Sequence, residues 1–243
     1  INKPAFALQS GLFHPEKYLR MKILNTLKNL VHSPEKKKWL EGGLVFWLAL
    51  LSFGIFIPFL GIYSDDWPFL YVYSKAGFQG VIDFIAWSRP FAGWLFAIPS
   101  GLSLQATWLP HVLLFFTRIA DALLLYWMLN LLWPRQQTSA FLAALVFVIF
   151  PSFKQQPLPM EYFAHFSMIG VFLLSVICMV KALDSQISLK KAWLLWGLSW
   201  LLSWGVFPLE YFFGLELLRP VLLAVALRNR GLVVYLMVLS AAI

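Results

Sequence analysis

Charged residues are scarce in this chain. Only 12% of its 243 residues are Asp, Glu, Lys or Arg, whereas 60% are hydrophobic, and the mean hydropathy is +0.75. A soluble domain carries about 25% charged and about 45–50% apolar residues, so this chain has too few polar groups to cover a surface that faces water. The composition excludes an ordinary soluble domain and predicts an all-α protein, a polytopic bundle of transmembrane helices.

The sequence also lacks features that mark other kinds of protein. Its one cysteine, Cys178, excludes an intrachain disulfide. It has no internal repeat, no glycine-rich phosphate loop and no zinc-ligand spacing. The net charge of +8 could suggest nucleic acid, but eight of the 19 Lys and Arg precede Gly42. That distribution is the positive-inside pattern, so we expect membrane lipid as a partner, no nucleic acid and a cytoplasmic N-terminus.

The beginning of the chain differs from the rest. Residues 1–38 are polar and basic and are predicted to form a cytoplasmic tail, ahead of a transmembrane bundle over residues 39–243. Because residues 21–23 read Met-Lys-Ile, we expect residues 1–20 to be an upstream extension. The segment 21–38 fits either a basic amphipathic helix on anionic lipid or a solvated tail.

Apolar runs of membrane-spanning character follow. The first predicted span is 39–62, and the three lysines directly before it hold its start in the cytoplasm. The later predicted spans are 109–133, 139–153, 160–181, 192–209 and 211–227. A further apolar run starts at Leu232 and is cut off, so we expect the bundle to be truncated at its C-terminus.

Residues 63–108 mix polar and apolar positions. Within them, residues 91–104 are apolar but short, and glycines and a proline interrupt them. If residues 91–104 do not cross, the later basic loops around Lys190 and Arg228 all fall on the cytoplasmic side; if they cross, those loops fall outside. We therefore predict that 63–108 is one external loop of amphipathic juxtamembrane helices.

Two neighbouring acids, Asp65 and Asp66, open this external loop. Like charges on neighbouring carboxylates repel, which can raise one pKa and make that group a better general base. The alternative is a hydrophilic stop that ends the helix. A second external acid, Glu161, follows two prolines at the start of a later span, where a helix N-terminus by itself favours an anion. The acids therefore predict either a site or topology signals.

Other side chains of the external loops are candidate ligands. Glu161 and His165 lie four residues apart on one helix face, and with Asp65 or Asp66 they could hold a divalent cation. Arg89 could grip a phosphate with two hydrogen bonds, or bind lipid headgroups instead, and Lys154 is similar. These residues are candidates for metal and phosphate binding.

Two oppositely charged pairs fall inside predicted spans. Arg118 and Asp121 lie three residues apart, as do Glu216 and Arg219. A charge at the centre of a membrane costs about 2.5–3.5 kcal/mol on insertion scales, so such groups usually pair and face the bundle. We predict structural pairing within each pair, with a functional path as the alternative.

Taken in order, these motifs resemble the GT-C superfamily of membrane glycosyltransferases, in particular bacterial relatives of dolichyl-phosphate-mannose–protein mannosyltransferases. The likeness covers about residues 40–185 and rests on four short motifs. These are the acid pair in residues 64–67 (Ser-Asp-Asp-Trp), a proline motif in 88–91 (Ser-Arg-Pro-Phe), residues 118–123 (Arg-Ile-Ala-Asp-Ala-Leu), and Glu161. The chain departs from the family pattern at two points. Its proline motif reads Arg-Pro where His-Pro-Pro is usual, and its second acid is Glu where Asp is commoner.

This resemblance implies transfer of a sugar from a polyprenyl-phosphate carrier to a glycan, lipid or protein acceptor, at the external face of a bacterial inner membrane. Asp65 or Asp66 would be the general base, with Asp65 preferred. Glu161 would assist or bind metal. The groups that would offset charge on the departing lipid phosphate are Arg89, Lys154 and His165.

Two other functions stay open on the sequence. A transporter or flippase of lipid-linked or anionic cargo would use the charged residues within the spans, and it should show paired repeats with broken helices. A non-catalytic membrane scaffold would use the external acids only as topology signals.

Overall fold

The computed structural model describes residues 34–150 and 157–228, and every regular element in these ranges is a helix. The elements are α2 (Pro34–Ser52), η1 (Gly54–Phe59), α3 (Asp66–Ala86), α4 (Gly93–Gln105), α5 (Leu109–Leu132), α6 (Gln137–Ile149), α7 (Pro159–Ala182), α8 (Leu189–Trp204), η2 (Glu210–Phe212), α9 (Phe213–Glu216) and α10 (Arg219–Leu227). This confirms the predicted all-α class.

The chain divides into two compact units, residues 1–43 and residues 44–243. In the first, the described residues belong to the start of α2, where the Lys37 ammonium lies 3.7 Å from a Glu41 carboxylate oxygen. The proposed amphipathic segment 21–38 lies outside the described residues apart from its last turn. Everything below concerns the second unit unless stated otherwise.

Three helical segments are long and apolar enough to cross a membrane. They are Trp39–Phe59, α5 and α7, which confirms the predicted spans at 39–62, 109–133 and 160–181. The 13 residues of α6 rise about 20 Å and the 16 residues of α8 about 24 Å, at about 1.5 Å per residue. These two helices are thus shorter than the spans predicted for them.

The predicted span 211–227 is wrong, because this stretch is not one helix. It is broken into η2, α9 and α10, and the last two are separated by Leu217 and Leu218. Pro220 lies in the first turn of α10. Proline disfavours helical geometry in the residue before it and lacks the amide that would continue a helix, so a helix tends to restart rather than run through it.

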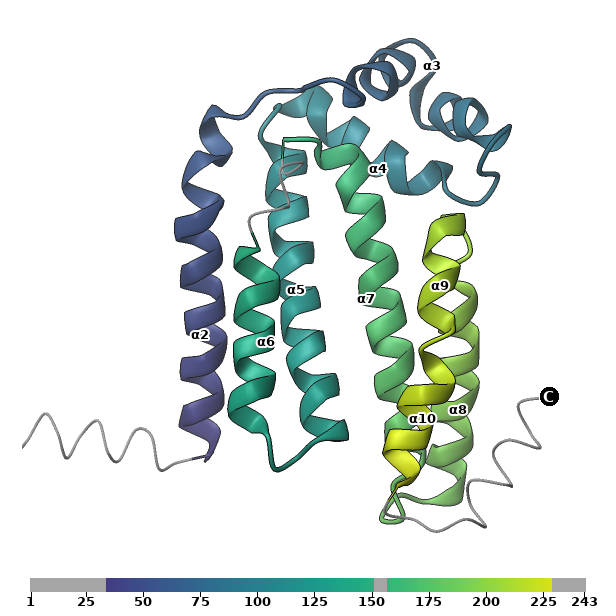
Figure 1. Cartoon of the computed structure of the whole chain (residues 1–243). Helices are drawn as coiled ribbons and strands as arrows, with labels where there is room; N and C mark the ends of the chain where they lie inside the picture. The colour runs from purple at the N-terminus through teal and green to yellow at the C-terminus, as the bar shows by residue number, and fades with distance from the viewer. Residues whose placement is uncertain (1–33, 151–156, 229–243) are drawn as a thin grey trace, which may run out of the picture. The chain divides into compact units, whose positions relative to one another are not determined.

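The predicted juxtamembrane helices are α3 and α4, which pack on each other and lie across one end of α5 and α7 (Figure 1). The 13 residues of α4 rise about 20 Å, too short for a ~30 Å hydrocarbon core. Helix α3 bends at Gly77, whose φ of 67° and ψ of −161° suit glycine alone. The prediction that 91–104 does not form a membrane span is therefore supported.

Helix α7 is the centre of the unit, since it packs against α3, α4, α5, α8 and α10. Near its N-terminus, Ala164 and Met168 join a cluster with Leu95 and Phe96 of α4. Further along, Phe172 and Val176 join a second cluster with residues of α5. Burial of apolar side chains on both stretches fixes α7 against the juxtamembrane layer and against the spans at once.

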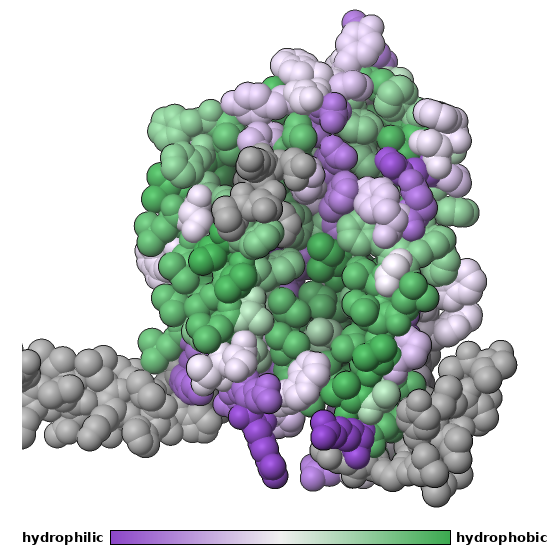
Figure 2. Space-filling model, viewed as in Figure 1, coloured by the Kyte–Doolittle hydropathy of each residue, from purple (hydrophilic) through white to green (hydrophobic). Residues whose placement is uncertain are grey.

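Polar residues concentrate at the ends of the helices. The α5–α6 connection, which carries Arg135, and the α7–α8 connection lie at the end opposite to α3 and α4 (Figure 1). Figure 2 shows mostly hydrophobic residues over the middle of the visible face and strongly hydrophilic residues at its lower edge. The predicted basic loops and the acid pair therefore lie at opposite ends, with membrane lipid as the natural contact of the apolar zone between.

The predicted pair Glu216–Arg219 is confirmed. The Arg219 guanidinium donates to both Glu216 carboxylate oxygens, with Nη2 2.8 Å from Oε1. It also donates to Ser175 Oγ of α7 at 2.6 Å and to Ser199 Oγ of α8 at 3.3 Å. Arg219 thus ties the broken segment to two longer helices, which is a structural role.

The predicted pair Arg118–Asp121 is wrong in its partners, although both side chains face the bundle as expected and are at most 2% exposed. Arg118 Nη2 donates to the Phe150 carbonyl at 3.4 Å, and its Cζ lies 3.9 Å from the centre of the Phe53 ring. Asp121 instead lies against Gly170 of α7. Residues three apart on a helix point about 60° apart, which here directs the two side chains to different neighbours.

Helix α7 therefore needs a glycine beside Asp121. A Cβ at Gly170 would lie 2.5 Å from Asp121 Oδ1, so Gly170→Val should lower the free energy of unfolding by about 1–3 kcal/mol, the usual cost of overpacking. Denaturant unfolding of the detergent-solubilised protein measures this. Gly197→Ala in α8 is the control, because nothing lies within 4 Å of its Cβ position; equal losses in both variants would contradict the contact.

Candidate functional site

Asp66 joins the start of α3 to the start of α7. Its side chain is fully buried, and its two carboxylate oxygens accept hydrogen bonds from the backbone amides of Met160 at 3.1 Å and Glu161 at 3.3 Å. Both amides lie in the first turn of α7, where amides have no partner inside the helix. The preceding residue Leu158 offers no side-chain bond. Asp66 thus caps α7 from a distant part of the chain.

The local backbone separates the two neighbouring acids. Ser64 adopts a φ of +42°, and the amides of Asp66 and Trp67 donate to the carbonyls of Tyr63 and Ser64. This tight turn directs Asp66 into the protein and leaves Asp65 exposed. Among the described residues, the Asp65 carboxylate accepts one bond, from Ser64 Oγ at 3.2 Å.

Burial raises the pKa of Asp66 from 3.8 to about 7. The charges of Glu161 and Asp65 contribute to this rise in pKa, whereas the two backbone hydrogen bonds oppose it. One carboxyl of the acid pair therefore does have a raised pKa, as the sequence suggested. The main cause is loss of water, however, and repulsion by the neighbouring Asp65 is the smallest of the contributions.

His165 lies one turn further along α7. Its Nδ1 is 2.7 Å from the Glu161 carbonyl oxygen, which can only accept, so Nδ1 carries a proton. In the neutral ring Nε2 then accepts from the Tyr211 hydroxyl, 2.7 Å away. The imidazole stacks with Tyr162 and with Tyr211, with ring centroids 5.0 and 5.2 Å apart. Its tautomer and orientation are thereby fixed.

Arg89 follows the end of α3 and pairs with η2. Its Nε lies 3.3 Å from Glu210 Oε2, and its Nη2 lies 3.4 Å from Oε1. Its Cζ also lies 5.7 Å from the centre of the Tyr211 ring. Burial raises the pKa of Tyr211 to about 12, so its hydroxyl keeps its proton. A backbone hydrogen bond and the Arg89 guanidinium lower the pKa of Glu210.

These contacts bring most of the predicted site residues to one end of the helices. Asp66 bonds to the backbone of Glu161, His165 bonds to the Glu161 carbonyl, and Arg89 meets His165 through Tyr211. Asp65 lies on the exposed side of the same turn. Lys154 lies outside the described residues. We call Asp65, Asp66, Glu161, His165, Arg89, Glu210 and Tyr211 the acid-end cluster.

The sequence alone missed Tyr211 and the pairing of Arg89 with Glu210. Glu210 and Tyr211 follow Pro208 in an apolar run, which indicates a turn but names no partner. Arg89 lies 121 residues away from Glu210, a separation that no local spacing rule covers. The one available signal in the sequence was the presence of two polar residues, Glu210 and Tyr211, within an apolar run.

The candidate metal ligands do not gather as a metal site. Within residues 34–150 and 157–228, no three His, Cys, Asp or Glu side chains come close enough together to hold an ion. Both nitrogens of His165 already have partners, and Asp65 is exposed whereas Asp66 is buried. The donor geometry of Asp65, Glu161 and His165 thus gives the metal hypothesis no support.

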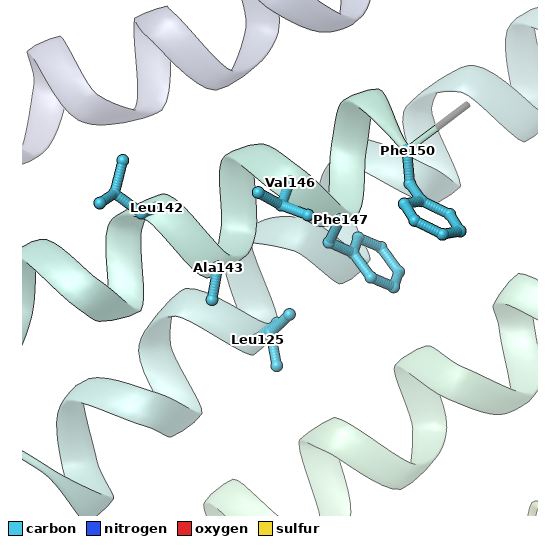
Figure 3. A pocket seen from close by; sticks show the side chains of 6 residues that line it. All are labelled: Leu125, Leu142, Ala143, Val146, Phe147 and Phe150. Carbon is cyan, nitrogen blue, oxygen red and sulfur yellow. The ribbon is translucent and has the colours of Figure 1, made fainter. Parts of the chain in front are cut away.

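A recess of about 460 Å³ lies along α5 and α6, and Figure 3 shows the side chains that line it. Its lining is Leu125, Leu142, Ala143, Val146, Phe147 and Phe150. It contains no group that could act as an acid, a base or a ligand for an anion. The recess has the chemistry of a lipid contact, whereas the acid-end cluster has the chemistry of a polar site.

Comparisons with protein-family models, with curated proteins and with solved structures found no match to this chain. The likeness to GT-C enzymes therefore rests on the order of the sequence motifs alone.

The raised pKa of Asp66 makes stability depend on pH. The folded protein binds this proton more tightly than the unfolded chain, so the free energy of unfolding should fall as pH rises from about 4 to about 7 and then level off. The fall should be on the order of a few kcal/mol. Asp66→Asn should remove that part of the slope.

Unfolding of the wild type and Asp66→Asn in neutral detergent at pH 4.5, 6 and 8 measures this difference. The variant also loses one acceptor at the start of α7, because an amide nitrogen cannot accept a bond from a backbone N–H. Parallel pH curves for the two proteins would show that Asp66 does not titrate in this range.

Proposed function

We propose that this chain belongs to a membrane glycosyltransferase of the GT-C kind, which transfers a sugar from a polyprenyl-phosphate carrier to an acceptor hydroxyl. The observation that carries the proposal is the bond between Asp66 and the first turn of α7. It supports a shared site for the acid pair and Glu161, two motifs that lie 95 residues apart in sequence. A lipid donor also accounts for a site at the end of apolar helices, because the donor's headgroup lies at that depth.

In this mechanism Asp65 is the general base. Its carboxylate is exposed and lightly bonded, whereas Asp66 is buried with both oxygens engaged. The acceptor oxygen attacks the anomeric carbon, and its proton passes to Asp65. The bond from that carbon to the phosphate oxygen breaks, and polyprenyl phosphate leaves with the electron pair. Attack opposite to the leaving group inverts the anomeric configuration.

Asp66 is a positioning residue in this account, since it sets the turn that presents Asp65 and the first turn that presents Glu161. In the part of the chain that the structure describes, no hydrogen bond reaches the Glu161 carboxylate, which leaves it able to bind sugar hydroxyls. Arg89 balances charge on the departing phosphate, and His165, whose two nitrogens are engaged, holds Tyr211 next to Arg89. Lys154 is a further expected contributor.

The proposed orientation has the acid-end cluster on the external face and the N-terminus in the cytoplasm. The basic residues Arg135, Lys181, Lys190 and Lys191 support it, because they lie in or next to the α5–α6 and α7–α8 connections, at the end opposite to α3. A bacterial inner membrane is the proposed location, by analogy with the GT-C relatives.

A transporter is the second candidate, and the observation that favours it is the break between α9 and α10. Broken helices with charged residues are typical of transport sites. Arg219, however, is bonded to Glu216, Ser175 and Ser199 at once, which is an arrangement that fastens helices together. The third possibility, a scaffold, predicts no effect of the acids beyond insertion.

Asp65→Asn should lower sugar transfer by at least about 10²-fold, the lower end of what a general base contributes, and leave folding intact because Asp65 is exposed. The measurement is release of labelled prenyl phosphate from a panel of short-chain polyprenyl-phosphate hexoses and pentoses, with the protein in liposomes. Asp83→Asn is the matched control, since Asp83 is an exposed acid of α3 bonded to Gln79.

Full transfer by the Asp65→Asn, Asp66→Asn double variant would remove the proposed base. If Arg118→Gln and Asp121→Asn abolish the protein's activity while Asp65→Asn leaves it unchanged, the transporter proposal is favoured over the enzyme proposal.

A further inference from the structure

The contact between Arg89 and Glu210 has the geometry of an anion site. Two guanidinium nitrogens face the two oxygens of one carboxylate, at 3.3 and 3.4 Å. A phosphate presents two oxygens to arginine in the same forked manner, which is why arginine recognises both groups. The Glu210 carboxylate therefore occupies the position that a phosphate on Arg89 would take.

The Arg89–Glu210 ion pair is weak enough for another anion to displace Glu210. The Arg89 side chain is 32% exposed and the Glu210 side chain 61% exposed, and an ion pair open to water contributes little to stability. Both distances exceed the about 2.7–2.9 Å of a strong charge-assisted bond. An anion arriving from solvent or from the membrane surface can compete for Arg89, because displacing Glu210 does not require breaking a buried contact.

Glu210 sits on an element that can release it. The element η2 is three residues long, and none of its residues is buried. Tyr211, the next residue of η2, holds this element in place. Its hydroxyl bonds to His165, and its ring stacks on the imidazole. Glu210 can therefore leave Arg89 by side-chain rotation while Tyr211 keeps η2 at the site.

We infer that Glu210 is an internal competitor for the phosphate site of Arg89, so that a lipid-linked phosphate binds only by displacing it. This inference rests on the proposed function for the identity of the ligand, a prenyl phosphate. A phosphate of bulk lipid headgroups has the same chemistry, and the experiment below separates the two sources.

The test uses the full chain in phosphatidylcholine nanodiscs, with ³²P-labelled farnesyl phosphate as the probe. Glu210→Gln should lower the Kd by up to about fivefold, which corresponds to about 1 kcal/mol, the upper range of an exposed ion pair. Arg89→Gln should weaken binding. Adding Glu210→Gln to Arg89→Gln should then change nothing, because the competitor has lost its site.

Asp83→Asn is again the control, since it removes one negative charge from α3 without touching Arg89. An unchanged Kd in Glu210→Gln, or an equal gain in Asp83→Asn, would overturn the inference. In nanodiscs that also contain phosphatidylglycerol, farnesyl phosphate should still bind more tightly to the variant. If phosphatidylglycerol abolishes farnesyl phosphate binding instead, bulk headgroups hold Arg89 and the inference fails.

The binding assay needs no sugar transfer, which keeps the two proposals apart. If Glu210→Gln tightens binding while Asp65→Asn leaves transfer unchanged, the anion site stands and the glycosyltransferase mechanism fails. If sugar transfer depends on Asp65 but Glu210→Gln leaves the Kd of farnesyl phosphate unchanged, the glycosyltransferase mechanism stands and the inference about Glu210 fails.

Discussion

The acid end of this protein depends on one carboxylate that caps a helix from another part of the chain. Asp66 accepts bonds from the first two free amides of α7 while it is fully shielded from water. Buried amides at a helix start must find acceptors, and Leu158, the residue before α7, supplies none. The same contact fixes where α3 begins and how the acid pair is presented. The Asp66 side chain thus both caps α7 and determines how the residues of the acid-end cluster are arranged.

Around that contact, α7 links the juxtamembrane layer to the spans. Its first turns pack on α4 and its later turns on α5 and α8, so residues that must act together are attached to one rigid helix. Tyr162 and His165 carry the contact onward to Tyr211 and, through it, to Arg89. The polar groups have different roles here: Asp65 is exposed and accepts one bond, from Ser64, whereas Asp66 and Arg219 hold helices in place.

Much of this fold could be read from the sequence, because apolar length and the distribution of basic residues are local signals. They predicted three helices that are long and apolar enough to span a membrane, and short helices over residues 63–108. They failed at 211–227, where overall hydropathy hid the effect of Pro220 on helix continuity, and at Arg118 and Asp121, where spacing along one helix did not reveal the neighbours that each side chain meets. The convergence of Asp66 with Glu161 was expected only from motif order. Tyr211 and the Arg89–Glu210 pair depend on tertiary contacts that no spacing encodes.

The most direct test of the account is whether the start of α3 touches the start of α7 in the membrane. In a Cys178→Ser background, which removes the one native cysteine, the pair Asp65→Cys and Glu161→Cys should be joined by a short bis-maleimide within one molecule. The pair Asp65→Cys and Lys190→Cys should not be joined. If each of these cysteines reacts singly with maleimide and yet the first pair is never cross-linked, the two acid motifs do not share a site.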